Sequence, residues 1–417
     1  MKKIVLSFGL LISTVTYSQS FAVEEKLQTY PFSNQHVGFV LYDPSTKREL
    51  VNYNGTKYFL PASNTKIFTL YSVLKNLNDS IPGLMYAETE DELHFQGTGD
   101  PTFLHPKFDN RRVFNFLKNS PKKLVYHANN FNDTSIGLGW SWDDFDQTFS
   151  SERNAFPIAE NMVTIERQGN TLSSFPKVFQ SSIVSKEQKF NRDPYQNQFY
   201  IAPKNATLRV PYITNPELTR TILEEILGRN VELSKEKIPM PSQLLFSTLV
   251  EPVTRLMMED SDNFLAEQLL ITASVNETGQ VGGKQVIEQM TNHHLKRLSQ
   301  KPIWNDGSGL SRYNLLSPKS MVELLDLLLQ EYPEEKIFNL LAIGGRTGSL
   351  KNYYKSATPY LFAKTGGMSN TVTLSGYLRA KSGKLLIFSL MNNNTGMDGT
   401  KVRRENEKFL NYVRDLY

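Results

Sequence analysis

The 417-residue sequence contains no cysteine and only six histidines. Without cysteine no disulfide can form, so the fold depends on its apolar core. The histidines are scattered and show no His-Glu-x-x-His or similar ligand spacing, which counts against a zinc peptidase. His293 and His294 are adjacent on an expected helix and point to different faces, so we expect a solvated surface there. The sequence therefore predicts no metal and no other cofactor.

The sequence also lacks a clear excess of either charge. Lys and Arg number 46 and Asp and Glu number 42. This near balance favours no polyanionic partner, so we expect no nucleic-acid binding. The apolar stretch at residues 4–15 is interrupted by Ser and Thr and falls short of the roughly 20 residues that span a bilayer. No later stretch is long enough, and we expect no membrane span.

The first 22 residues are typical of a cleavable secretory signal. Lys2 and Lys3 precede the apolar stretch, and the small residues Ser20 and Ala22 suit a cleavage site near Ala22. We therefore expect a protein exported to the periplasm. The remaining residues 23–417 are too many for one core, so two or more domains are expected.

Three short polar motifs occur in one order: Ser63-Asn64-Thr65-Lys66, Ser261-Asp262-Asn263 and Lys364-Thr365-Gly366. The Ser-x-x-Lys spacing alone is uninformative, because it recurs at Ser72/Lys75, Ser120/Lys123, Ser174/Lys177 and Ser234/Lys237. The sequence around each motif must therefore select among them.

Ser63 has the surroundings of a nucleophile. It opens the apolar stretch 67–74 after Pro61, which predicts the first turn of a buried helix. A helix N-terminus offers free N–H groups to a developing oxyanion, and the i,i+3 spacing puts Lys66 on the same face. Ser72 would lie inside the same helix and has neither advantage.

The second and third motifs are placed by neighbouring elements. Ser261 precedes an apolar helical run, whereas the competing Ser274-Val275-Asn276 ends it. Lys364-Thr365-Gly366 occurs once, on an expected strand over 361–367 that is followed by strands over 371–378 and 384–391. We expect these strands to form an antiparallel meander.

The two ends of the chain are expected to share this sheet. Strands over 36–42 and 49–53 predict a hairpin, and apolar residues on one face of 405–417 predict a helix packed on the sheet. The stretch 87–240 is rich in Asn, Asp, Ser and Phe and has short alternating strands, so we expect a β-rich insertion there. The main domain then comprises residues 23–86 and 241–417.

With these motifs in place, the chain resembles the class C low-molecular-mass penicillin-binding proteins, the D-alanyl-D-alanine carboxypeptidase/endopeptidase family. Segments 97–102, 139–144 and 305–314 carry the resemblance further. It implies an α/β (α+β) fold of the penicillin-binding and serine β-lactamase-like transpeptidase type, with an antiparallel five-stranded sheet flanked by helices. It also implies two small subdomains within the insertion.

The motif residues can be assigned chemical roles. A lysine serves as a base only if its pKa is lowered, and burial beside a second cation, Lys364, would lower that of Lys66. Lys66 is the expected base for Ser63, although the group that takes the serine proton stays open. Ser261 would relay the proton to the leaving group, and Asn263 would bind the substrate peptide and hold Lys66 in place.

Further residues are expected to bind substrate. Lys364 and Thr365 suit a terminal carboxylate, and Gly366 lets a substrate lie along the strand edge. The resemblance implies an oxyanion hole from the N–H groups of Ser63 and Gly367. The residue at position 367 more commonly bears a side chain in the family.

The resemblance also implies a side-chain pocket formed by Asp144, Arg312 and Met368. Each of the three also has a purely structural interpretation: a turn cap, an internal ion pair and a core residue, respectively.

These features predict a serine DD-peptidase that acts on peptidoglycan stem peptides through an acyl-enzyme and is blocked by β-lactams. One alternative is a serine β-lactamase, which needs a second base for deacylation such as Glu267 or Glu288. Another is a non-catalytic cell-wall binding protein. The sequence leaves open the balance of carboxypeptidase and endopeptidase activity and whether a homo-oligomer forms.

Overall fold

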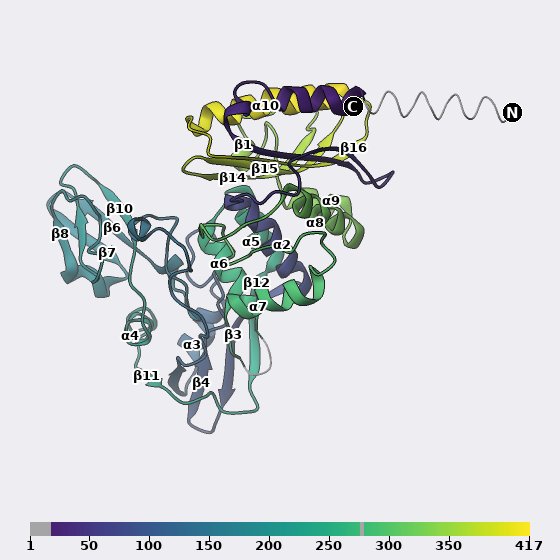
Figure 1. The fold of residues 1–417 in the computed structure, drawn as a ribbon. Helices are drawn as coiled ribbons and strands as arrows, with labels where there is room; N and C mark the ends of the chain where they lie inside the picture. The colour runs from purple at the N-terminus through teal and green to yellow at the C-terminus, as the bar shows by residue number, and fades with distance from the viewer. Residues whose placement is uncertain (1–17, 276–278) are drawn as a thin grey trace.

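The computed structural model describes residues 18–275 and 279–417 and consists of a helix-flanked sheet with a β-rich insertion (Figure 1). The sheet has the strand order β13-β14-β15-β16-β1-β2. Its strands are β1 (His36–Asp43), β2 (Arg48–Tyr53), β13 (Ala342–Ile343), β14 (Leu361–Met368), β15 (Thr371–Arg379) and β16 (Leu385–Asn393). All pairings between them are antiparallel.

The predicted sharing of the sheet by the two chain ends is confirmed. The central strand β16 pairs with β15 on one side and with β1 on the other, where Phe39 lies opposite Leu390. The sheet has six strands and not five, because the two-residue strand β13 adds to β14 at Phe362 and Ala363.

Helices cover both faces of the sheet (Figure 1). On one face lies α10 (Gly399–Leu416), together with the helical residues 18–27. On the opposite side lies a group of helices: α2 (Lys66–Asn76), α5 (Val250–Glu259), α6 (Asn263–Thr272), α7 (Gly283–Gln289), α8 (Pro318–Glu331) and α9 (Glu334–Asn339). Of these, α8 packs directly on the strands, whereas α7 packs on α6 away from the sheet. Alternate residues of β16 serve the two cores: Phe388 and Leu390 pack toward α10, whereas Ile387 and Met391 pack toward α2 and α8.

The C-terminal helix is longer than the sequence pattern predicts. It begins at Gly399 and not near residue 405, because the Asp398 side chain accepts hydrogen bonds from the N–H groups of Thr400 and Lys401. Phe409 is the centre of its contact with the sheet, with ring centroids 5.5 Å from Phe32 and 5.0 Å from Phe39.

The insertion contains three sheets. A five-stranded sheet has the order β11 (Val231–Ser234), β5 (Lys123–His127), β4 (Glu92–Gln96), β3 (Ser80–Glu88) and β12 (Gln243–Leu249). A three-stranded sheet comprises β10 (Thr207–Pro211), β6 (Met162–Gln168) and β7 (Thr171–Phe175), and a two-stranded one comprises β8 (Ile183–Ser185) and β9 (Phe199–Ile201). The insertion helices are α3 (Arg112–Asn119) and α4 (Pro216–Leu227).

The domain boundaries at residues 87 and 240 remain a prediction. In the structure the bordering strands β3 and β12 pair with each other and belong to the five-stranded sheet. This pairing favours junctions nearer residues 80 and 249. One apolar cluster joins this sheet to the three-stranded one, since it contains Phe95 as well as Val163.

Short helical turns complete the chain. They are η1 (Phe32–Asn34), η2 (Ala62–Thr65), η3 (Trp142–Asp144), η4 (Ala159–Asn161), η5 (Lys177–Ser182), the π-helical η6 (Met290–His294) and η7 (Gly348–Leu350). Within the described ranges, no helix combines the length and apolarity needed to cross a bilayer. The predicted cleavage near Ala22 is followed by Val23 and Leu27, which are buried in the core beneath α10.

We expect Phe409→Ala to lower the free energy of unfolding by about 3–5 kcal/mol, because it leaves a cavity between α10 and the sheet. Denaturant unfolding followed by circular dichroism measures this loss. Lys408→Ala, at an exposed position one residue earlier, is the control and should change stability by no more than about 0.5 kcal/mol. Equal effects of the two substitutions would show that α10 is not held through Phe409.

Candidate active site

Ser63 lies in the turn η2, directly before α2. Ala62 has a φ of 46°, and this turn presents the Ser63 side chain at a partly exposed position while Lys66 is fully buried. The competing Ser72 is buried inside α2, where its hydroxyl donates to the Phe68 carbonyl at 2.9 Å. The structure thus favours Ser63 over Ser72 as the nucleophile.

Strand β14 runs against η2 at very close range. The Asn64 side chain donates to the Lys364 carbonyl at 2.8 Å and accepts from the Ser375 hydroxyl at 2.6 Å. A Cβ at Gly366 would lie 2.8 Å from the Pro61 carbonyl oxygen, so only glycine permits this approach. Because β13 pairs only with Phe362 and Ala363, the edge of β14 from Lys364 onward has no neighbouring strand among the described residues.

The Lys66 amine lies at the centre of the site. Its Nζ donates to Ser63 Oγ at 3.0 Å, to Asn263 Oδ1 at 2.6 Å and to the Ser308 carbonyl at 2.7 Å. A neutral amine has two N–H groups, which the amide and the carbonyl engage, and its lone pair is then directed at the Ser63 hydroxyl. The contacts therefore suit either protonation state.

Burial lowers the pKa of Lys66 to about 8, while the carboxylates of Asp262, Asp306 and Glu267 oppose this shift. Burial was one of the two predicted causes and is confirmed, whereas the other, the second cation Lys364, is not among the causes that shift the pKa of Lys66. Burial and the Lys66 ammonium instead hold the pKa of Lys364 well below its ordinary value.

Lys364 is buried and directed at Ser261. Its Nζ donates to Ser261 Oγ and to the Thr365 carbonyl, each at 2.8 Å. Ser261 lies between α5 and α6 with a φ of 61°, and this left-handed conformation places its hydroxyl beside the lysine. Since Lys364 is 0% exposed, its predicted ionic contact with a substrate carboxylate is not supported.

Asn263, the first residue of α6, connects the amine to the insertion. Its Oδ1 accepts from Lys66, and its Nδ2 donates to the Phe149 carbonyl at 3.0 Å. The Asn263 amide has a second N–H group, which can still donate to a substrate peptide as predicted. Ser63, Lys66, Ser261, Asn263 and Lys364 are thus brought together in two contact groups.

Buried carboxylates behind Lys66 are fixed by the insertion. Glu267 accepts from the Ser308 N–H at 2.7 Å and pairs with Arg153 at 3.1 Å. Asp306 accepts from the Trp140 indole N–H at 2.9 Å. Sequence reasoning missed the roles of Arg153 and Asn64, whereas Asp306 and Ser308 fell within the segment 305–314 that was identified only by resemblance.

The expected substrate-binding residues lie around this centre. The Thr365 hydroxyl donates to Ser349 Oγ at 2.7 Å, Gly367 is exposed, and Met368 is half-buried and belongs to neither core of the sheet. The structural interpretation of Met368 as a core residue is therefore not supported.

Asp144 and Arg312 come from opposite sides of the junction with the insertion. The Arg312 Nε donates to Ser141 Oγ at 3.3 Å, and its backbone N–H donates to the Gly139 carbonyl at 3.0 Å. Burial raises the pKa of Asp144, Asp143 raises it further and Arg312 opposes the shift, although no ion pair joins Asp144 to Arg312. A substrate role for these two residues stays a prediction.

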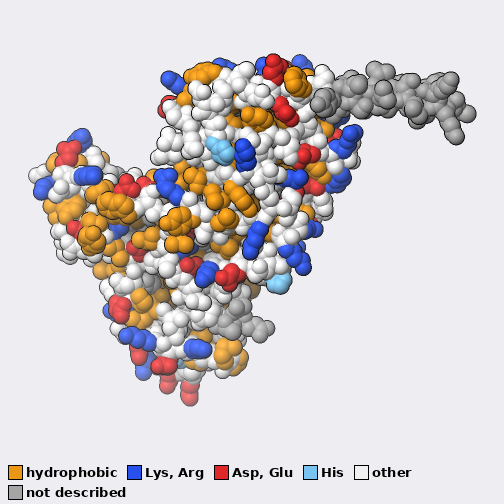
Figure 2. All heavy atoms as spheres, viewed as in Figure 1, with side chains coloured by type: hydrophobic (Ala, Val, Ile, Leu, Met, Phe, Trp, Pro, Cys, Tyr) orange, Lys and Arg blue, Asp and Glu red, His pale blue; other side chains and the backbone are white. Residues whose placement is uncertain are grey.

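Exposed apolar side chains gather beside this junction. Figure 2 shows them between the sheet-bearing part and the insertion. Trp142 is 73% exposed and Tyr313 is 57% exposed, and both are neighbours of the proposed pocket residues. In the described ranges, no three His, Asp or Glu side chains are arranged to hold a metal ion.

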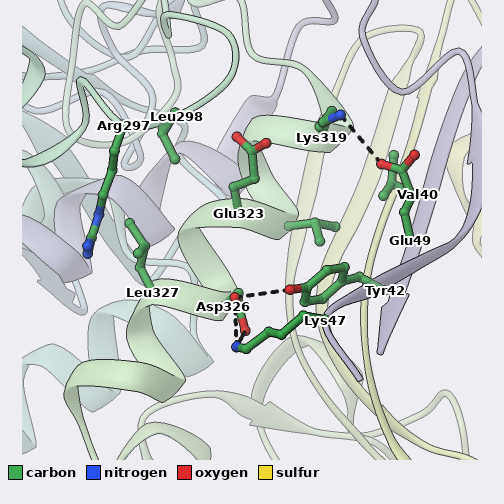
Figure 3. A pocket seen from close by; sticks show the side chains of 11 residues that line it. Val40, Tyr42, Lys47, Glu49, Arg297, Leu298, Lys319, Glu323, Asp326 and Leu327 are labelled. Carbon is green, nitrogen blue, oxygen red and sulfur yellow. Dashed lines mark hydrogen bonds and ion pairs between the residues drawn. The ribbon is translucent and has the colours of Figure 1, made fainter. Parts of the chain in front are cut away.

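A separate cavity lies between β1, β2 and α8 (Figure 3). It has a volume of about 380 Å³ and contains none of the motif residues. Asp326 there pairs with Lys47 at 3.0 Å and accepts from the Tyr42 hydroxyl at 3.4 Å, so these charges already have partners. This cavity is therefore not part of the candidate active site.

Two known proteins of one organism are similar to this chain in sequence. The chain is 23% identical to the D-alanyl-D-alanine carboxypeptidase DacB of Haemophilus influenzae, covering 99% of this chain and 97% of that protein. It is 25% identical to a D-alanyl-D-alanine endopeptidase of the same organism over 51% of this chain and 70% of that protein.

A solved structure confirms the predicted fold class. The crystal structure of penicillin binding protein 4 (dacB) from H. influenzae matches with a TM-score of 0.70 at 22% identity, covering 90% of this chain and 94% of that one. The model of the D-Ala-D-Ala carboxypeptidase 3 (S13) family matches residues 19–413. The chain therefore belongs to the D-Ala-D-Ala carboxypeptidase 3 (S13) family of serine peptidases.

Proposed function

We propose that the chain is an exported serine DD-peptidase that cleaves D-alanyl-D-alanine in peptidoglycan stem peptides, and also D-alanyl cross-links, through a Ser63 acyl-enzyme that β-lactams trap. The observation that carries this proposal is the Ser63–Lys66–Asn263 contact group beside the unpaired edge of β14. The H. influenzae relatives named as a carboxypeptidase and an endopeptidase support both activities.

Acylation begins when neutral Lys66 takes the proton of Ser63 as the Oγ attacks the D-alanyl carbonyl carbon. The contact of 3.0 Å between Lys66 Nζ and Ser63 Oγ suits this transfer. The N–H groups of Ser63 and Gly367 are proposed to stabilise the oxyanion of the tetrahedral intermediate. The substrate lies along β14 as an added strand, since Gly366 adds no side chain to the strand.

Collapse of the intermediate breaks the peptide bond and requires a proton on the leaving amine. Ser261 is proposed to deliver it, with Lys364 at 2.8 Å as its proton source. Water then hydrolyses the ester and restores Ser63. The periplasm is the proposed compartment, because the first 22 residues have the composition of a secretory signal.

The alternative of a β-lactamase has no support from its two candidate glutamates. Glu267 is buried and already bonded to Arg153 and the Ser308 N–H. Glu288 lies exposed on α7. A non-catalytic binding protein would not require the hydrogen bonds of Lys66 to Ser63 and of Lys364 to Ser261, so these intact contacts also favour the peptidase.

Ser63→Ala should abolish covalent labelling by a fluorescent penicillin and the hydrolysis of muropeptides, because the hydroxyl forms the acyl bond. Labelling is measured on gels, and products from muropeptide monomers and cross-linked dimers are measured by mass spectrometry. Ser72→Ala is the control and should label like the wild type. A labelled peptide that maps to Ser72 would refute the assignment of the nucleophile.

The acylation rate should rise with pH through about 8, because only neutral Lys66 accepts the serine proton. Below that pKa, the rate should increase about tenfold for each pH unit. Stopped-flow acylation by a chromogenic β-lactam, measured from well below to well above this pKa, provides the profile. Lys66→Arg should stay inert throughout, since a guanidinium keeps its proton.

The same measurement has a second variant and a control. Glu267→Gln should move the profile toward lower pH, because it removes a carboxylate that favours the Lys66 ammonium. Glu288→Gln, which changes an exposed glutamate, should leave the profile in place. An active Lys66→Arg enzyme would contradict the base role.

Asp144→Ala and Arg312→Ala should each slow hydrolysis of peptides with a charged diamino-acid side chain before the D-alanine. Loss of one charge-assisted contact costs about 1.5–3 kcal/mol, roughly ten- to a hundredfold in kcat/KM. Penicillin acylation should barely change, because a small β-lactam need not fill that pocket. Asp143→Ala is the matched control, and equal losses on both substrates would indicate a structural role.

A further inference from the structure

A groove in the insertion is lined by segments that adjoin its two larger sheets. It has a volume of about 650 Å³. One side comes from the loop between β4 and α3 and from α3 itself, which contribute Phe108 and Phe114. The other side comes from the end of β7, from η5 and from α4, and it contributes Phe175, which is 43% exposed. The groove therefore offers aromatic surface outside the candidate active site.

Two cations of this groove have no anionic partner among the described residues. The Arg111 guanidinium stacks on the Phe114 ring, with 5.6 Å between its Cζ and the ring centroid, and forms no ion pair. The Lys177 side chain is exposed and forms neither a hydrogen bond nor an ion pair. An unpaired guanidinium and an unpaired ammonium in one groove favour an anionic ligand.

The carboxylates of the groove only partly offset these cations. Glu225 accepts from the backbone N–H groups of Lys177 and Val178, each at 2.6 Å, so its carboxylate is already bonded. Asp109 is the remaining carboxylate of the described lining, and it is exposed without a side-chain partner there. The unpaired charge of the groove is therefore positive.

A series of contacts connects this groove to the candidate active site. Ser349 in η7 accepts a hydrogen bond of 2.7 Å from the threonine hydroxyl of β14. The preceding Gly348 packs on the last residue of α5, since a Cβ added to this glycine would lie 2.2 Å from the Glu259 carbonyl oxygen. The next residue, Asp260, pairs with Lys107 at 2.9 Å, and Lys107 lines the groove. The groove thus begins one residue from the second motif.

These contacts are on the leaving side of the proposed substrate path. The proposed pocket of Asp144, Arg312 and Met368 serves the side chain before the scissile bond. A substrate added along β14 then runs from Met368 on the acyl side toward Thr365 and η7 on the leaving side. The peptide strand that leaves with the amine is therefore directed toward Lys107 and the groove.

We propose that this groove binds the leaving strand of a cross-linked substrate, a peptide whose diamino acid carries a carboxylate. This inference rests on the proposed function, because that strand belongs to its substrate. Arg111 and Lys177 pair with carboxylates of the strand, and the phenylalanine rings pack against its apolar parts. A single D-alanine is too short to reach the groove, so the groove favours cross-links over single stem peptides.

The test compares a cross-linked muropeptide dimer with a muropeptide monomer that ends in D-alanyl-D-alanine. The double variant Arg111→Ala/Lys177→Ala should lower kcat/KM about threefold to tenfold on the dimer, because two exposed ion pairs are lost. It should change kcat/KM on the monomer and penicillin labelling less than about twofold. Arg112→Ala/Lys186→Ala removes two exposed cations of the insertion outside the groove and is the matched control.

Asp109→Asn provides a test with the opposite sign. It removes the unpaired carboxylate from the lining and should raise kcat/KM on the dimer but not on the monomer, whereas a purely structural lining predicts no gain. Thermal unfolding verifies that the variants are folded.

Equal losses of the double variant on dimer and monomer, or no loss on the dimer, would overturn the inference. If the wild-type enzyme labels with penicillin and cleaves both substrates while the double variant cleaves the dimer normally, this inference fails and the proposed function stands. A wild-type enzyme that neither labels nor cleaves either substrate would refute the proposed function itself.

Discussion

Burial of the Lys66 amine is the constraint on which the other contacts of the site depend. A lysine removed from water needs an acceptor for each N–H group, and here the acceptors come from η2, from α6 and from the loop at Ser308. These segments are far apart in the sequence, so the amine is satisfied only when the sheet, the helices and the loop are all in place. The same burial lowers its pKa to about 8, as the proposed role of a base requires.

The insertion takes part in this constraint. It supplies Arg153 to the buried Glu267, the Trp140 indole to Asp306 and the Phe149 carbonyl to Asn263. Removing one member of a buried ion pair leaves an uncompensated charge, so the carboxylates near Lys66 require their partners. The insertion therefore helps to fix the charged and polar groups around Lys66.

Successive residues of strand β14 face opposite sides of the sheet. Lys364 and Gly366 face η2. Lys364 contacts Ser261, and Gly366 permits the close approach of the strand to the backbone of η2. Thr365 and Gly367 face α10 and Arg403. The two sets of side chains therefore lie on opposite faces of one strand.

The sequence by itself determined the three motifs, the elements that carry them, the pairing of the N-terminal hairpin with the C-terminal meander, and the choice of Ser63 over Ser72. These follow from local patterns: period-two and helical spacing, turn residues, and a serine and lysine three residues apart. Only the tertiary structure decided which groups surround each lysine. The contacts of Arg153 and Asn64 carry no local signal, because their partners lie 114 and 300 residues away along the chain, respectively. Burial of Lys66 followed from its place at the start of an apolar helix, whereas the carboxylates that oppose its pKa shift depend on distances through space, which spacing along the chain does not specify.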